Sequence, residues 1–184
     1  PNIFADVKDD YWAKDYVAFM NYHGVVSGVL SNGKYHFRPA DTITRGEFAV
    51  MVANMLNIDT ESFKDTSSEM ADEDRTPAWC ANHIKALCEL GIMNGKELEN
   101  KLVFDFGAPL SRAEAAAVIS RLLPENLPAE EKKFTDSKSI PTWCKDAFTK
   151  LTTLNVISGY SDGSIKPLNN TTRAEVIKML YEVY

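Results

Sequence analysis

The sequence is short of the residues from which metal centres and disulfide frameworks are built. Its 184 residues include three cysteines and three histidines. Three cysteines are too few for a disulfide scaffold and leave at least one thiol unpaired. The set Cys80, His83 and Cys88 does not recur in the repeats described below, and the acidic run 69–74 lacks regular ligand spacing. We therefore expect no metal site, and nothing in the sequence predicts a cofactor.

Long apolar runs, positive net charge and catalytic motifs are absent too. No run of about 18 apolar residues occurs, so no membrane insertion is expected. The net charge of −6 repels nucleic acid and anionic membranes, so any anion must be captured locally. No Gly-x-Ser-x-Gly elbow, phosphate loop or credible Cys/His pair is found, which predicts that the chain is not an enzyme.

The sequence does contain three internal repeats of one unit. Each copy opens on a Phe-x-Asp landmark: Phe4-Ala5-Asp6, Phe63-Lys64-Asp65 and Phe134-Thr135-Asp136. A tryptophan and a glycine follow in each copy, namely Trp12, Trp79 and Trp143, then Gly28, Gly95 and Gly159. Each copy closes on a Thr/Ser-Arg-Ala/Gly-Glu tetrapeptide, at 44–47, 111–114 and 172–175. These landmarks predict repeats at 1–62, 63–133 and 134–184 that form one cooperative domain.

Apolar periodicity predicts two helices in each repeat. The first has an i, i+4, i+7 face and the second an i, i+3, i+4, i+7 face, as at positions 13, 17, 20 and 48, 51, 52, 55. A longer loop with turn signals at Asn32-Gly33 and Asp162-Gly163 joins them, and any strand there is expected to be minor. One helix pair cannot bury its own stripe. The prediction is therefore an all-α bundle of three repeats with approximate threefold symmetry.

The closing tetrapeptide marks the start of each second helix. Its first residue reads as the N-cap and its glutamate as the capping-box partner, giving the pairs Thr44 and Glu47, Ser111 and Glu114, Thr172 and Glu175. The residue between them is an arginine that faces the positive end of the helix dipole, at a cost of about 0.3–1 kcal/mol. The recurrence of Arg45, Arg112 and Arg173 has two explanations. Either they bind an external carboxylate or phosphate, or they pair with carboxylates of the same chain such as Asp6, Asp65 or Asp136.

Other recurring residues also leave alternatives open. The tryptophans are either core packing or, if partly buried, flat apolar faces on which sugar rings stack. The glycines most simply supply a positive φ where the first helix ends, and close approach of a ligand to the backbone is the alternative. Cys80 and Cys144 occupy the position of Ala13, so they are expected to be small buried apolar residues.

With these landmarks in place, the chain resembles the S-layer homology domain family over nearly its whole length. The tetrapeptides carry the resemblance, and residues 158–163 match the family's loop. The resemblance implies a three-pronged spindle that anchors bacterial surface proteins to the cell wall without a covalent bond, outside the cell. It further implies grooves that bind secondary cell wall polysaccharide, often through a pyruvate ketal on N-acetylmannosamine, with the signature arginine holding the anion.

Carried over residue by residue, the implied ligand-binding set is Arg45, Arg112, Arg173, Trp12, Trp79, Trp143, Gly28, Gly95, Gly159 and Tyr160. Repeat two lacks the Asp-Gly turn of its companions, so we expect its loop to differ in shape and its groove to bind weakly or not at all. The chain starts at Pro1 without an initiator Met, which suggests a processed chain or an excised module. We expect it to be fused to a larger surface protein or enzyme. The alternative is a structural or self-assembly module with internally paired arginines and no glycan binding.

Overall fold

The computed structural model describes residues 1–184 and is mostly helical. Two helices lie in each predicted repeat, as the apolar periodicity predicts: α1 (Lys14–Tyr22), α2 (Arg45–Met55), α3 (Ala78–Glu89), α4 (Arg112–Arg121), α5 (Lys145–Thr153) and α6 (Arg173–Tyr181). Short 3-10 turns complete the helical part, at 60–63, 73–75, 137–139 and 142–144. None of the six helices combines the length and the apolar content that crossing a bilayer requires.

Two short antiparallel hairpins accompany the helices, so the fold is mostly helical and not strictly all-α, with strands as minor as expected. In repeat one, β1 (Val29–Ser31) pairs with β2 (Lys34–His36), and in repeat two, β3 (Lys96–Leu98) pairs with β4 (Lys101–Val103). Both hairpins close through two-residue turns with positive φ, which suits the twist of paired strands.

The loop of repeat two therefore has the same shape as that of repeat one, and the expected difference was wrong. Glu99 and Asn100 adopt φ values of 49° and 60° without a glycine, and asparagine tolerates this left-handed region better than most residues. Repeat three is the one that differs. Its loop is three residues shorter between Gly159 and Arg173 and forms no strand.

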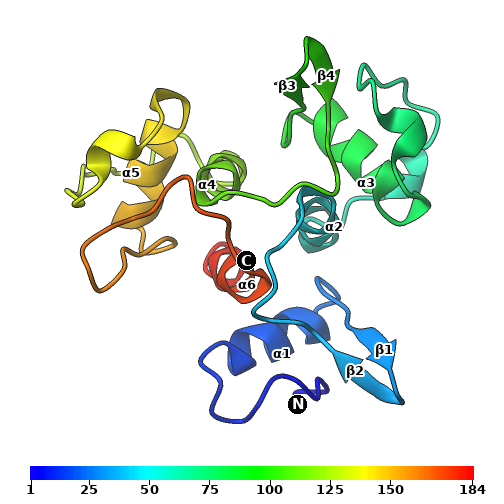
Figure 1. Ribbon diagram of the computed structural model, residues 1–184, viewed down its shortest axis with the longest axis horizontal. Coiled ribbons are helices and arrows are strands. Elements are labelled where there is room, and N and C mark those ends of the chain that lie inside the picture. The colour runs from blue at the N-terminus through cyan, green and yellow to red at the C-terminus, as the bar shows by residue number, and fades with distance from the viewer.

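The second helix of every repeat lies at the centre of the molecule. Figure 1 shows α2, α4 and α6 end-on in the middle, with α1, α3 and α5 in three outer lobes. Packing runs between repeats, because α2 lies against α3, α4 against α5, and α6 against α1. The last pair joins the C-terminal helix to the N-terminal one, so every helix pair is drawn from two different repeats.

One hydrophobic core joins the repeats. Its 38 buried residues come from all six helices and from the loops between them, so no repeat has a core of its own. The stripe predicted for α2 is buried, from Phe48 to Met55.

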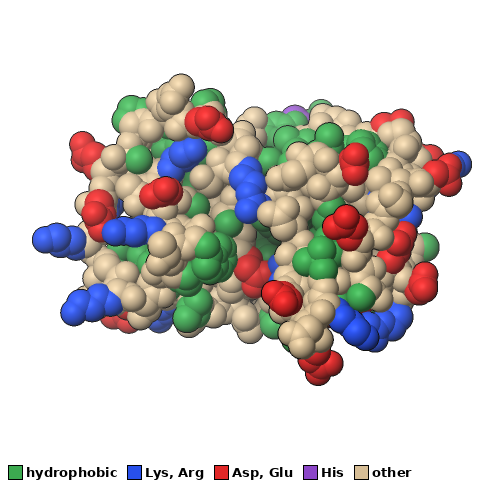
Figure 2. Space-filling model, turned by 90° about the horizontal axis from the view of Figure 1, so that it is seen from above, with side chains coloured by type: hydrophobic (Ala, Val, Ile, Leu, Met, Phe, Trp, Pro, Cys, Tyr) green, Lys and Arg blue, Asp and Glu red, His purple; other side chains and the backbone are tan.

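Cys80 and Cys144 are buried and unpaired, and burial raises the pKa of each thiol to about 11. Charges of both signs are dispersed over the face in Figure 2, which carries no continuous basic surface.

A carboxylate near the start of each repeat holds the chain that leads into the second helix. Asp6 accepts hydrogen bonds from the backbone N–H groups of Phe37 and Arg38, at 2.8 and 2.7 Å. Asp136 binds residues 165 and 166 in the same way. In each case the second residue held has a positive φ, as at Arg38 with 61°. The carboxylate therefore stabilises a strained turn.

In repeat two this carboxylate is Asp72, which corrects the landmark at Asp65. Asp72 is buried and accepts from the N–H groups of residues 104 and 105, at 2.9 and 2.8 Å. Met70-Ala71-Asp72 is thus the opening of repeat two, where the sequence pattern pointed to Phe63-Lys64-Asp65. Spacing is the better signal, because Met70 precedes Trp79 by nine residues, as Phe134 precedes Trp143.

Candidate functional site

Each second helix begins at its signature arginine and is capped by the residue before it. The hydroxyl of that residue accepts the backbone N–H three positions on at 3.1 to 3.2 Å, in the pairs Thr44 and Glu47, Ser111 and Glu114, Thr172 and Glu175. The reciprocal bond that completes a capping box occurs in repeat two alone, from Ser111 N–H to Glu114 at 3.4 Å. In the other two repeats the carboxylate accepts from a threonine hydroxyl at its own helix start, Thr44 for Glu47 at 3.1 Å and Thr171 for Glu175 at 3.2 Å.

The signature arginines are buried and reach into the next repeat. Arg45 donates from Nε to the carbonyl of Phe104 at 2.7 Å and from Nη2 to that of Asn94 at 2.9 Å. Its Nη1 is paired with Glu114. Only 4% of Arg45 is exposed. Three of its five N–H donors are therefore committed to its own chain.

The same arrangement recurs at the other two junctions. Arg112 donates to the carbonyls of Ile165 and Ser158 and pairs with Glu175 at 3.4 Å. Arg173 donates to the carbonyl of Phe37 at 2.9 Å and pairs with Glu47, so it ties repeat three back to repeat one. Burial lowers the pKa of Arg173, and Glu47 opposes that shift.

These pairs identify the carboxylates that the arginines meet inside the chain. The partners are the tetrapeptide glutamates of the following repeat, whereas Asp6, Asp65 and Asp136 make no ion pair with any signature arginine. The glutamate partner accounts for an arginine at the first position of each helix. Its negative charge offsets the unfavourable interaction of the arginine with the helix dipole.

Aromatic rings cover each guanidinium. Arg45 lies over the ring of Phe104 and Arg173 over that of Phe37, each 4.8 Å from the ring centre. Repeat three has Ile165 in the corresponding place, and there Tyr160 supplies the ring, 4.8 Å from Arg112 and 4.4 Å from the Lys166 ammonium. Burial raises the pKa of Tyr160. Tyr160 thus lies between two cations of its own chain.

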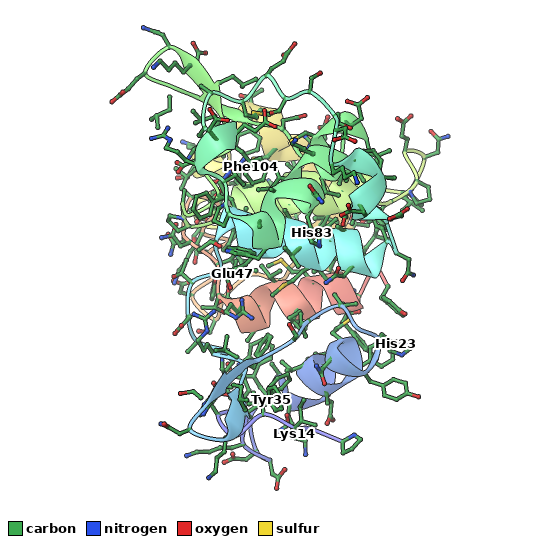
Figure 3. The ribbon with its side chains drawn as sticks, turned by 90° about the vertical axis from the view of Figure 1, so that its right-hand side faces the viewer. Lys14, His23, Tyr35, Glu47, His83 and Phe104 are labelled. Carbon is green, nitrogen blue, oxygen red and sulfur yellow. The ribbon has the colours of Figure 1, made fainter.

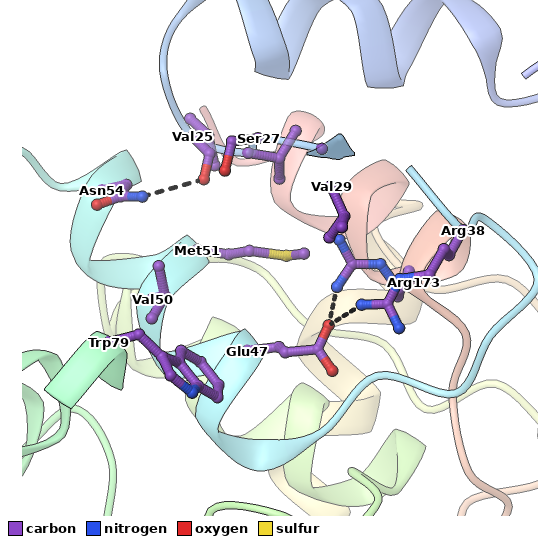
Figure 4. A pocket seen from close by; sticks show the side chains of 12 residues that line it. Val25, Ser27, Val29, Arg38, Glu47, Val50, Met51, Asn54, Trp79 and Arg173 are labelled. Carbon is purple, nitrogen blue, oxygen red and sulfur yellow. Dashed lines mark hydrogen bonds and ion pairs between the residues drawn. The ribbon is translucent and has the colours of Figure 1, made fainter. Parts of the chain in front are cut away.

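Two open pockets flank the arginines, and we name them the first and second groove. The first groove, about 350 Å³, is lined by residues 25–29 and by Arg38, Glu47, Trp79 and Arg173 among others (Figure 4). The second groove, about 580 Å³, is lined by residues 93–96 and by Arg45, Glu114, Arg121 and Trp143 among others. Figure 3 shows Glu47 on the side of the molecule where the hairpins lie, with His23 on the other.

The two grooves have equivalent parts. Each combines the segment after a first helix, the glutamate of the same repeat, the signature arginine of the preceding repeat and the tryptophan of the following one. Trp79 and Trp143 are 51% and 63% exposed, so they are not core residues. Trp12 is exposed to 53% but lies outside both grooves.

The repeated glycines have a different cause from the one expected. None of Gly28, Gly95 and Gly159 has a positive φ, a conformation found instead at the helix ends at 24, 91 and 155. A Cβ on Gly28 would lie 2.5 Å from the Phe4 ring and 2.9 Å from the carbonyl of His36. Gly95 and Gly159 are held against Met70 and Phe134 in the same way. The absence of a side chain lets the groove segment pack against the opening residue of its repeat.

Comparison with known proteins agrees with the repeat pattern. A family model described as S-layer homology domain matches residues 3–49, 69–116 and 133–177. The chain is 30% identical over 97% of its length to an amylopullulanase of Thermoanaerobacterium thermosulfurigenes, and 30% over 96% to an endoglucanase of Bacillus sp.. It is 25% identical over 96% of its length to an S-layer protein of Bacillus thuringiensis subsp. finitimus. It spans 9%, 18% and 21% of those three proteins.

Proposed function

Because the chain belongs to the S-layer homology domain family, we propose that it binds an anionic cell wall polysaccharide in the grooves between its repeats. Domains of this family are noncatalytic modules that attach surface proteins to the cell wall, and the relatives carry them as a small part of enzymes and S-layer proteins. The chain is accordingly a cell-wall anchoring module at the cell surface. The protein anchored through it is proposed to be a larger surface protein or enzyme.

The observation that carries the proposal is the pair of equivalent grooves, each with a half-exposed tryptophan and a cationic end. A half-exposed indole offers a flat apolar face to a pyranose ring, and an arginine fork matches the two oxygens of a carboxylate. A sugar with a carboxylate substituent, such as a pyruvate ketal on N-acetylmannosamine, combines both features. Grooves of about 350 and 580 Å³ have the size of ordinary small-ligand sites.

In this proposal Arg45 and Arg173 form the cationic ends of the two grooves. Both line a groove although most of each side chain is buried, and Arg45 has two N–H donors that its own chain does not use. A carboxylate at this place would be bound together with the internal glutamate. Arg112 is proposed to bind least, because it lines neither groove.

We also propose that the repeats form the three-pronged spindle of the family, with approximate threefold symmetry. The central position of α2, α4 and α6 and the matching helix pairs at each junction support this arrangement. The two grooves then lie at two of three related junctions.

Replacing the groove tryptophans tests the proposal. The variant Trp79→Ala with Trp143→Ala removes both stacking faces, and Trp12→Ala is the matched control, since Trp12 is equally exposed but lies outside both grooves. We expect the double variant to lose at least about 90% of its retention on purified cell wall polysaccharide, while the control binds as before. Circular dichroism checks that both stay folded. Full retention by a folded double variant would refute groove binding.

The second candidate function is a structural or self-assembly module, and the internal ion pairs of all three arginines favour it. It predicts that no wall glycan is retained and that the chain associates with itself as its concentration rises. Analytical ultracentrifugation together with the retention assay separates the two functions. A chain that stays monomeric and binds polysaccharide excludes the second.

A further inference from the structure

The cationic side chains that line the two grooves differ in whether they form ion pairs within the chain. Arg38 and Arg173 in the first groove both pair with Glu47, and Arg38 also pairs with Asp41 at 3.4 Å. In the second groove, Arg45 pairs with Glu114. These three arginines therefore present little uncompensated charge to a ligand.

The remaining cations of the second groove are Lys96 and Arg121. Lys96 is paired with Asp105 at 2.8 Å. Arg121 has no carboxylate within 4.0 Å, and it is exposed at the end of α4. It is the one cation lining either groove that lacks an ion pair within the chain.

The orientation of Arg121 is nevertheless fixed. Its Nη1 donates to the backbone carbonyl of Ile92 at 2.9 Å, which leaves four of its five N–H donors for a ligand. The first groove has Asn54 at the corresponding place, nine residues after its helix-start arginine, and its amide donates to the carbonyl of Val25 at 3.3 Å. The third repeat has Glu182 there. The same structural contact is thus made by a neutral amide in one groove and by a free cation in the other.

We infer that the second groove is the principal anion site of the chain, and that Arg121 is the residue that makes it so. The inference rests on the proposed function, because it names the groove and the residue that hold the carboxylate or other anionic group of the glycan. Counted with all their ion-pair partners, the cations of the first groove are balanced, whereas those of the second exceed their carboxylates by one. This inference is the opposite of the expectation that the groove of repeat two binds weakly or not at all, and the titration below decides between them.

The three tryptophans make the grooves separately observable. Trp143 lines the second groove, Trp79 the first, and Trp12 neither. Their indole N–H signals in a proton–nitrogen NMR spectrum, assigned with single Trp→Phe variants, report on each groove in one titration. The probe is the methyl glycoside of N-acetylmannosamine carrying a 4,6-pyruvate ketal, with the unmodified glycoside as the uncharged control.

We expect the Trp143 signal to shift at a probe concentration about tenfold lower than the Trp79 signal, as one additional charge-assisted hydrogen bond would produce. Arg121→Gln keeps a donor for Ile92 and removes the charge, so it should raise the dissociation constant at Trp143 about tenfold and leave that at Trp79 unchanged. Asn54→Arg should strengthen binding at Trp79. Raising the salt concentration should reduce the difference in dissociation constant between the two grooves, because salt screens the charge of Arg121.

The outcomes distinguish this inference from the proposed function. If no indole signal moves with the charged probe, groove binding of this sugar fails altogether. If Trp79 responds first, or if Arg121→Gln leaves the titration at Trp143 unchanged, glycan binding stands and the assignment of the principal site to Arg121 is overturned.

Discussion

The substitution Arg173→Met should destabilise the protein strongly, because Arg173 joins the last repeat to the first. It removes the hydrogen bond to the carbonyl of Phe37 and the ion pair with Glu47. Both contacts join residues that are more than 120 positions apart in the sequence. Methionine retains much of the apolar stem and its packing on Phe37. The change therefore isolates the polar contacts.

The magnitude follows from what the substitution leaves behind. Removing one partner of a buried ion pair costs about 3–5 kcal/mol, because the other charge stays buried. Glu47 keeps Arg38 at 3.5 Å and its side chain is 20% exposed, so the lower end, about 3 kcal/mol, applies. For a chain of this size 1 kcal/mol corresponds to about 2–4 °C, which gives a fall in Tm of about 6–12 °C.

Thermal unfolding followed by circular dichroism measures this fall. Arg38→Met is the matched control, because it removes the same charge from a side chain that is 45% exposed and should cost about 1 kcal/mol or less. A double-mutant cycle that combines Arg173→Met with Glu47→Gln measures the interaction energy between these two side chains. If Arg173→Met lowered the Tm by less than about 2 °C, the view that the signature arginines fasten the repeats together would be wrong.

Three further predictions concern the loops and the pH response. Gly28→Ala should cost about 1–3 kcal/mol in urea unfolding, because the new Cβ meets Phe4, and an unchanged midpoint would contradict the packing explanation. Asp72→Asn should lower the Tm by several degrees through the turn it holds, whereas Asp65→Asn should have almost no effect; the reverse ranking would restore the landmark at Asp65. Burial lowers the pKa of His83 below its usual 6.5, so the unfolded chain takes up the proton first and stability should decrease as the pH falls below 6.5. In His83→Asn that decrease should be smaller between pH 6.5 and 5, and an identical pH profile would show that His83 is not responsible.

Local signals predicted two helices in each repeat and the start of each second helix correctly. A capping residue, a glutamate and an apolar stripe lie within one short segment, so α2, α4 and α6 begin at the arginines that the sequence indicates. For the tryptophans the sequence left two alternatives, core packing or a partly exposed apolar face, and the structure shows the exposed one. The resemblance to the S-layer homology domain family is confirmed by the matches to all three repeats.

Features that depend on contacts between distant residues were not predictable in this way. The partner of Arg45 is 69 residues away, and no local pattern distinguishes Glu114 from the nearer aspartates. The need for glycine at position 28 arises from the ring of Phe4 across the fold, which the sequence does not show. The loop of repeat two was expected to differ because it lacks a glycine turn, yet Glu99 and Asn100 adopt the positive φ values that the hairpin needs.

The most direct test of the account is the affinity of the chain for purified wall polysaccharide before and after mild acid has removed its pyruvate ketals. Isothermal titration at low salt measures both. We predict clear binding to the pyruvylated polymer and a loss of at least about tenfold after its removal, because the free cation of the second groove then has no anionic group to bind. Equal affinity for the two polymers, or no binding to either, would contradict it.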